Sequence, residues 1–199
     1  MLNITVLVSG GGTNLQAILD AQAGGGLEGG AVKCVVSSNP GAYAITRAER
    51  AGIKTVVIDK KAHTPESFDD AVLVVLKENN TDIVVFAGFL SILGKKITDA
   101  YAGRMINVHP SLIPSFCGKS FYGLRVHEAA LEYGVKVTGA TVHYVNEVTD
   151  GGEIILQKAV PVEEGDTPET LQRRVMEAER ELLPKAISIV CKKLKNSTL

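Results

Sequence analysis

The sequence predicts an α/β fold: a Rossmann-like, doubly wound, mostly parallel sheet extended by an antiparallel C-terminal strand pair and a long C-terminal helix. In the first half, short runs that are apolar throughout alternate with amphipathic helical segments, which is typical of parallel strands covered on both faces. Two strand-like segments then follow each other with no helix between them, which favours an antiparallel pair. A long helical pattern opens at Pro168.

The parallel part is predicted from strands and helices in alternation. The expected strands are Ile4–Val8, Val32–Val36, Thr55–Ile58, Ile83–Phe86 and Met105–Val108. The expected helices are Leu15–Ala23, Tyr43–Ala51, Ser67–Lys77 and the shorter Ile97–Tyr101. Another helix is expected to open at His127 in "HEAALEYG".

The C-terminal part is expected to add two strands, Thr138–Tyr144 and Ile154–Val160, joined by the loop "VNEVTDGGE". Asp166 or Thr167 can cap the last helix, and Pro168 suits its first position. Pro184 is expected to kink or interrupt that helix. One domain over residues 1–199 is the simplest organisation.

Composition excludes several classes of protein. The net charge of −1 gives no reason to expect nucleic acid or an anionic membrane as partner. The three cysteines form no C-x-x-C pair, so neither a disulfide framework nor a zinc site is expected. No signal peptide or membrane-length apolar run is present. A cytoplasmic protein without a metal is therefore expected.

The stretch "SGGGTN" (9–14) lies between the first strand and the first helix. Glycines let the backbone approach a ligand closely, and the helix N-terminus favours an anion. A phosphate is therefore expected at Gly12, Thr13 and Asn14, where a Cβ on Gly12 would intrude on it. No P-loop lysine follows, and no acidic residue ends the second strand, which argues against ATP and NAD. A plain turn capped by Asn14 remains the alternative.

Asn107 and His109 stand at the carboxyl end of a predicted parallel strand, where ligands bind in such sheets. Separated by one residue, they share a face, and both could donate to a carbonyl oxygen that gains negative charge. Asp150, before two glycines, could orient His109 and raise its pKa. On spacing alone, a lone histidine at a strand end is more often structural than catalytic.

Five ordered motifs carry a resemblance: "SGGGTNLQA", "FAGFLSIL", "NVHPSLIPSF", "VTGATVHYV" and "DGGEIILQ". Together they resemble the phosphoribosylglycinamide (glycinamide ribonucleotide) formyltransferase family, from Ile4 to about Pro184. The resemblance implies transfer of a formyl group from 10-formyltetrahydrofolate to glycinamide ribonucleotide in purine biosynthesis, through a tetrahedral intermediate. Both substrates are small molecules. The protein would be a monomer or homodimer, with residues 1–100 as the phosphate-binding half and residues 101–199 as the catalytic and folate-binding half.

The resemblance assigns roles residue by residue. Asn107, His109 and Asp150 match the catalytic trio, with Asn107 also beside the folate. Gly12, Thr13 and Asn14 match the phosphate-binding segment, and Glu179 matches a glutamate that contacts the glycinamide substrate. The backbone stretch that lies against the pterin is matched by Leu90, Ser91, Ile92 and Leu93. No metal is implied.

Some positions depart from the family or keep two interpretations. Pro65 stands where many members have an arginine near the folate tail, and His63, Lys60 or Lys61 could compensate. Cys117 is interpreted as an ordinary loop cysteine, with a reactive thiol as the alternative. His143 is interpreted as a half-buried, hydrogen-bonded strand residue. His127 is explained as well by packing or capping as by ligand contact, and the Ile113–Pro114 peptide is expected to be cis.

Three rival functions are considered. Two are related folate enzymes, a formyltetrahydrofolate hydrolase and a methionyl-tRNA formyltransferase. The hydrolase carries an extra domain before the core, and the tRNA enzyme carries a basic domain that this sequence does not contain. The third rival is a non-catalytic nucleotide-binding module, which explains the glycine turn but not the trio.

Overall fold

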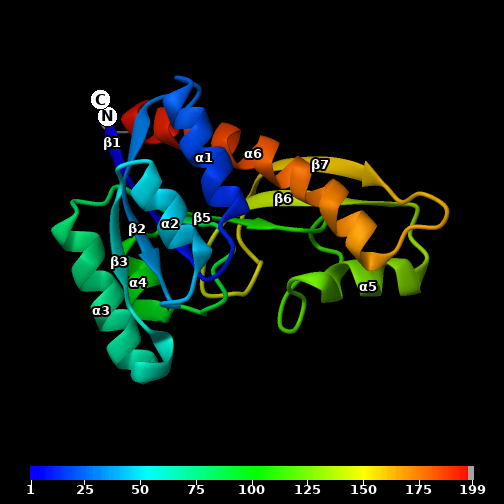
Figure 1. The fold of residues 1–199 in the computed structure, drawn as a ribbon, viewed down its shortest axis with the longest axis horizontal. Helices are drawn as coiled ribbons and strands as arrows, with labels where there is room; N and C mark the ends of the chain where they lie inside the picture. The colour runs from blue at the N-terminus through cyan, green and yellow to red at the C-terminus, as the bar shows by residue number, and fades with distance from the viewer. Residues whose placement is uncertain (197–199) are drawn as a thin grey trace.

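A computed structural model describes residues 1–196, and a seven-stranded sheet with the order β3-β2-β1-β4-β5-β6-β7 forms its centre. The strands are β1 (Leu2–Val8), β2 (Gly30–Ser37), β3 (Lys54–Val57), β4 (Ile83–Phe86), β5 (Met105–His109), β6 (Val137–Tyr144) and β7 (Ile154–Pro161). β1 to β5 pair in parallel, whereas β5–β6 and β6–β7 are antiparallel. The predicted sheet is confirmed, and Figure 1 shows its antiparallel part extending away from the parallel one.

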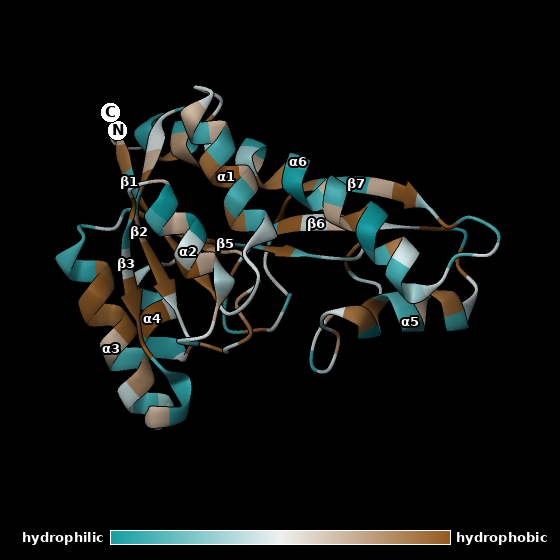
Figure 2. Cartoon of the chain, in the orientation of Figure 1, coloured by the Kyte–Doolittle hydropathy of each residue, from teal (hydrophilic) through white to brown (hydrophobic). Residues whose placement is uncertain are grey.

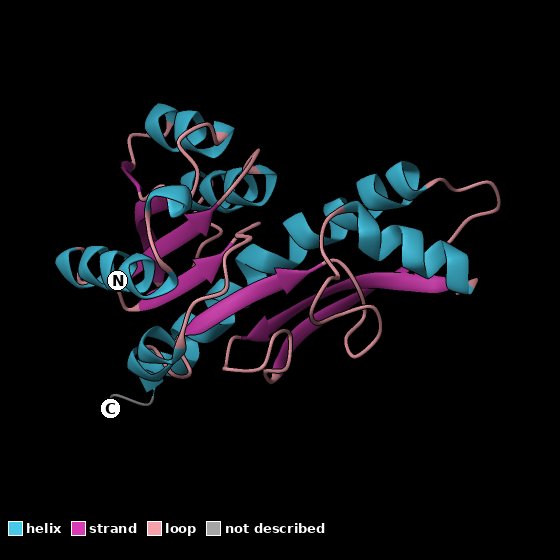
Figure 3. Ribbon diagram, turned by 90° about the horizontal axis from the view of Figure 1, so that it is seen from below, coloured by secondary structure: helices cyan, strands magenta, loops and turns pink. Residues whose placement is uncertain are grey.

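The helices are α1 (Thr13–Ala23), α2 (Tyr43–Arg50), α3 (Pro65–Glu78), α4 (Lys95–Ala100), α5 (Leu124–Tyr133) and α6 (Pro168–Asn196), with a 3₁₀ turn η1 (Lys60–Ala62) after β3. Helices lie on both faces of the parallel strands (Figure 3), with α1 and α2 on one face and α3 and α4 on the other, whereas α5 packs against α6. α6 packs along β6 and β7 and also reaches α1 (Figure 1). One element of the C-terminal half therefore covers part of the N-terminal half.

Side chains that alternate along the strands pack into two separate hydrophobic cores, one on each face of the sheet. Ile4, Val6 and Val8 of β1 join the cluster beneath α1, α2 and α6, whereas Leu7 joins the cluster beneath α3 and α4. Figure 2 shows the strands as predominantly hydrophobic and the outer helix faces as hydrophilic. Side chains on both faces of these strands are buried, and this explains why the runs in the sequence are apolar throughout.

Two helix predictions need correction. His127 does not open α5, which begins three residues earlier at Leu124. Pro184 does not interrupt α6, which continues through it to Asn196. Pro184 and its neighbour Leu183 are buried, so packing against the sheet stabilises the helix where one backbone hydrogen bond is lost. Thr167 caps α6 by accepting from the N–H of Thr170 at 3.3 Å.

Candidate active site

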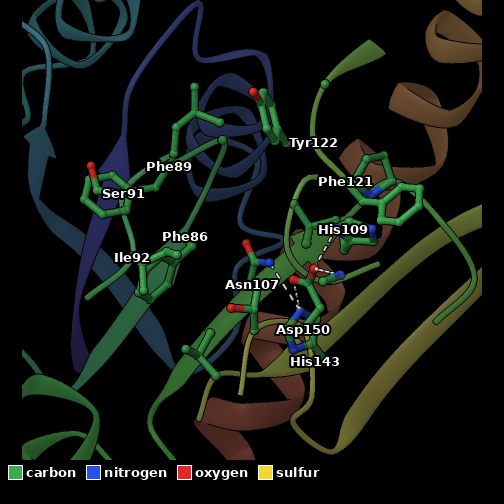
Figure 4. A pocket seen from close by; sticks show the side chains of 18 of the residues that line it. Phe86, Phe89, Ser91, Ile92, Asn107, His109, Phe121, Tyr122, His143 and Asp150 are labelled. Atoms are coloured by element: carbon green, nitrogen blue, oxygen red, sulfur yellow. Dashed lines mark hydrogen bonds and ion pairs between the residues drawn. The ribbon is translucent and has the colours of Figure 1, made fainter. Parts of the chain in front are cut away.

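A cavity of about 700 Å³ opens at the carboxyl end of β5. One wall is apolar and comes from Phe86 and the segment after β4, and another comes from Phe121 and Tyr122 in the loop before α5. Polar side chains gather on its floor (Figure 4). An apolar slot with a few convergent polar groups is the usual form of a site for a small organic molecule.

Asn107 and His109 are the third and fifth residues of β5, so they share one face, and both line the cavity. His109 is almost fully buried, and its Nε2 lies 2.9 Å from the carbonyl oxygen of Phe116. That carbonyl can only accept, so Nε2 carries a hydrogen. The loop after β5 is held in place by Thr141, whose hydroxyl donates to the carbonyl of Ser111 and accepts from the N–H of Ile113. The Ile113–Pro114 peptide in this loop is cis, as predicted.

Asp150 reaches the same point from the loop between β6 and β7. Its backbone adopts a left-handed conformation with φ of 55°. Its Oδ2 accepts from the N–H of Gly118 at 2.8 Å and lies 3.5 Å from Nδ1 of His109. The three residues of the predicted trio are thus brought together, although Asp150 is far from the others in the sequence.

The pKa of His109 differs from the expectation. Burial lowers the pKa of His109 below its usual value, and the opposing effects of Asp150 and the Phe116 carbonyl are smaller. Burial also acts to raise the pKa of Asp150, but His143, His109 and the Gly118 N–H outweigh it, so that pKa is lowered. Asp150 raises the pKa of His109 relative to what burial alone would give, without bringing it above the normal value.

His143 is a member of this cluster that the sequence interpretation missed. It is buried, not half-buried, with 1% of its surface exposed. It is the cross-strand partner of Asn107, and its Nε2 lies 3.2 Å from Asn107 Nδ2 and 3.6 Å from Asp150 Oδ1 (Figure 4). The available signal was the strand period: in an antiparallel pair, the alternation that places Asn107 on one face also places its partner there.

The glycine-rich turn precedes α1, which begins at Thr13 without a side-chain cap. Arg47 of α2 donates from Nε to the carbonyl of Gly11 at 2.8 Å, so a cation lies beside the turn. Gly12 has φ of 71°, and a Cβ added there would lie 2.6 Å from the Cβ of Ala44. The expectation that this Cβ would intrude on an anion is wrong, because it points at α2.

Gly12→Ala is therefore expected to destabilise the fold, since alanine would be strained at this φ and would push α2 away. A loss of about 2 kcal/mol or more would lower Tm by about 4–8 °C, measurable by thermal unfolding. Gly11→Ala is the matched control, because nothing lies within 4 Å of a Cβ there. Equal losses in both variants would contradict this explanation.

Asn14 and Glu179 meet on the cavity wall. Asn14 Nδ2 donates to Glu179 Oε2 at 3.0 Å, and both residues are buried. Burial raises the pKa of Glu179 to about 7, although the Asn14 hydrogen bond opposes this. Asn14 Oδ1 is buried without a hydrogen-bond partner among the described residues. A ligand with a donor group would satisfy it.

Glu179→Gln is expected to stabilise the protein at pH 8 and not at pH 4. The folded state keeps a proton on Glu179 up to about pH 7, whereas an unfolded glutamate loses it near its ordinary value of 4.5. Stability therefore falls as pH rises through that window, by on the order of 3 kcal/mol, and glutamine avoids this loss.

Urea unfolding at the two pH values measures the effect of Glu179→Gln. Glu181→Gln on the same helix is the control with the opposite sign. Hydrogen bonds from Lys158 and Lys185 lower the pKa of Glu181 to about 2, so this variant should lose stability at pH 8. A gain for Glu179→Gln of equal size at pH 4 would contradict the titration.

The segment expected to face a pterin lines the cavity along its length. Leu90 and Ile92 are largely exposed, whereas Ser91 and Leu93 are buried. A second hollow of about 480 Å³ shares Leu90 and Ser91 with the first and is also lined by Lys60 and Lys61.

The remaining residues singled out in the sequence lie around the cavity or near the start of α3. Pro65 starts α3 after the capping residue Thr64. His63 is exposed and lies 3.2 Å from the Ser67 hydroxyl. Burial raises the pKa of the partly exposed Cys117 thiol, so it is a poor nucleophile at neutral pH. His127 is buried on the cavity wall, where burial lowers its pKa to about 4 and its Nδ1 has no partner within residues 1–196.

Two whole-molecule observations concern other kinds of site. Within the described residues, no three His, Cys, Asp or Glu side chains are grouped to hold a metal ion. No helix in residues 1–196 is both long and apolar enough to cross a membrane.

Comparison with known proteins defines the class. A family model described as formyl transferase matches residues 2–187. The phosphoribosylglycinamide formyltransferase of Escherichia coli (strain K12) is 39% identical over 188 residues, which cover 94% of this chain and 86% of that protein. The chain therefore belongs to the formyl transferase family.

Within that family, the chain is similar to phosphoribosylglycinamide formyltransferases in particular. The crystal structure of glycinamide ribonucleotide transformylase 1 from Symbiobacterium toebii superposes with a TM-score of 0.91 at 42% identity, covering 97% of this chain and 89% of that one. The human trifunctional purine biosynthetic protein adenosine-3 is 45% identical over 94% of this chain, but the chain spans only 18% of its length.

Proposed function

We propose that the chain transfers the formyl group of 10-formyltetrahydrofolate to the amine of glycinamide ribonucleotide in purine biosynthesis. The observation that carries this proposal is the convergence of Asn107, His109 and Asp150 on the floor of an apolar cavity. A formyl carbonyl placed there would meet an amide and an imidazole from one strand face. The flat pterin ring of the folate would then lie against Leu90–Leu93.

In this mechanism the acceptor amine attacks the formyl carbon, and negative charge develops on the formyl oxygen. Asn107 donates a hydrogen bond to that oxygen from Nδ2, and a protonated His109 donates one from Nδ1, because its Nε2–H already bonds to the Phe116 carbonyl. The developing negative charge favours the protonated ring that burial disfavours. Asp150 holds the ring and favours its charged form. A proton then passes from the attacking amine to the leaving folate nitrogen.

The other assignments follow from the same proposal. Gly12, Thr13 and Asn14 bind the substrate phosphate at the uncapped start of α1, with Arg47 adding positive charge nearby. Glu179 contacts the glycinamide part of the substrate from the cavity wall. Residues 1–100 supply the phosphate half and residues 101–199 the catalytic and folate half of one domain.

The proposed setting is the cytoplasm, supported by three cysteines that are all free. The proposed partners are the two small-molecule substrates, with the chain acting as a monomer or homodimer. Pro65 stands where many family members have an arginine, and Lys60 and Lys61 supply the missing positive charge. The hollow that these lysines line adjoins the cavity.

The test is an assay of the purified chain with 10-formyltetrahydrofolate, followed by the absorbance of the deformylated folate. Product formation that requires glycinamide ribonucleotide supports the proposal. Deformylation at the same rate without it would indicate a hydrolase, and a requirement for methionyl-tRNA would indicate the tRNA enzyme. Binding of the nucleotide without turnover would favour a non-catalytic module.

A further inference from the structure

His143 occupies a position that the proposed chemistry does not yet use. It lies on β6 directly across from Asn107 on β5, and its ring contacts both Asn107 and Asp150. It is among the residues that line the cavity, but only 1% of its surface is exposed, so its closest polar contacts are these neighbours. A buried histidine between two groups of a reaction site has a defined tautomer, which the surrounding hydrogen bonds determine.

The tautomer of His143 follows from its partners. Nδ1 lies 2.8 Å from the carbonyl oxygen of Tyr144, and a carbonyl only accepts, so Nδ1 carries the hydrogen. In the neutral ring Nε2 is then an acceptor. Asp150 Oδ1, at 3.6 Å from Nε2, is beyond hydrogen-bonding distance. Asn107 Nδ2, at 3.2 Å, is the group that can donate to it.

This contact distinguishes the two orientations of the Asn107 amide. With the amide nitrogen toward Nε2, one N–H bonds to His143 and the second remains for another acceptor. In the flipped orientation, the amide oxygen would face the Nε2 lone pair with the Asp150 carboxylate close by, so three acceptors would oppose one another. His143 therefore stabilises the orientation with the nitrogen inward by making the alternative unfavourable.

We propose that His143 is a positioning residue that fixes the orientation of the Asn107 amide, so that its second N–H is available to the oxygen on which charge develops. This inference rests on the proposed function for the identity of that oxygen. The contribution of His143 to the reaction passes through Asn107.

Two substitutions separate the two ring nitrogens. His143→Asn keeps a donor near the Nδ1 position for the Tyr144 carbonyl but has no atom at the Nε2 position. His143→Gln places an amide oxygen near the Nε2 position and can still accept from Asn107. We expect His143→Asn to lower kcat by about tenfold, with KM changed by less than about twofold, and His143→Gln to stay within about threefold of the wild type.

A double-mutant cycle with Asn107→Ala tests the route of this effect. Measured by single turnover, His143→Asn should cause no further loss of rate when Asn107 is already alanine. An undiminished tenfold loss in that background would overturn the proposal, as would equal losses for His143→Asn and His143→Gln. Melting temperatures of all variants show whether each one is folded.

Nuclear magnetic resonance of the ¹⁵N-histidine-labelled wild-type protein gives an answer that does not depend on turnover. The ring of His143 should carry its proton on Nδ1 with Nε2 unprotonated, and a proton on Nε2 would overturn the proposal. Because no substrate is needed, this result still tests the positioning of Asn107 if the protein proves not to transfer a formyl group.

Discussion

Asn107→Ala is expected to lower kcat by about 10²–10³, the usual cost of losing one donor to a developing oxyanion. KM should change little, because the hydrogen bond strengthens mainly in the transition state. Steady-state kinetics with both substrates measure this. Asn107→Asp is the companion variant: it keeps the shape, removes the N–H donor and should be at least as damaging.

The fold should tolerate Asn107→Ala, since the residue is only partly buried in β5. An unchanged melting temperature would separate loss of chemistry from loss of structure. If kcat stayed within about tenfold of the wild-type value, Asn107 would not be a donor to the reacting oxygen, and the mechanism would need another group in that role.

Asp150→Asn is expected to lower kcat at neutral pH by at least about 10² and to change its pH dependence. Burial already lowers the pKa of His109, and Asp150 partly opposes this. Removing the carboxylate charge lowers that pKa further. Since the protonated ring is the donor, the decline of kcat/KM on the alkaline side should move to lower pH.

Asp70→Asn is the matched control for charge removal, because Asp70 is an exposed partner of Lys96 on the surface. It should change neither kcat nor the pH profile. Near wild-type kcat in Asp150→Asn, with an unshifted alkaline limb, would show that Asp150 does not act on His109 in the way proposed.

The sheet was predictable because its physical cause is local. Strands buried on both faces must be apolar at every position, and such runs are visible in one sequence, so Ile83–Phe86 was predicted with its observed ends. The strand predicted as Met105–Val108 ends one residue later, at His109, and Asn107 and His109 share one face as expected. The early start of α5 and the continuity of α6 through Pro184 depend on packing against other elements.

The remaining features of the site depend on contacts between distant segments. Asp150 joins His109 only because β6 turns back along β5, which spacing alone did not reveal and the family resemblance did. The direction of the Gly12 Cβ depends on how closely α2 packs. The lowered pKa of His109 depends on how deeply the loop after β5 covers it. The role of His143 was missed because the alternation of side chains along one strand does not show which residue of the next strand lies opposite it.

The contact between α1 and α6 has a consequence for recombining this protein with its relatives. Asn14 from the first half and Glu179 from the second form one buried hydrogen bond, and the same core contains Leu15 and Leu183. In a chimaera that takes its first hundred residues from one parent and the remainder from another, α1 and α6 come from different parents. Their contacting side chains must still be compatible. Crossovers that keep α1 and α6 from the same parent should yield folded chimaeras more often than a simple exchange at the midpoint.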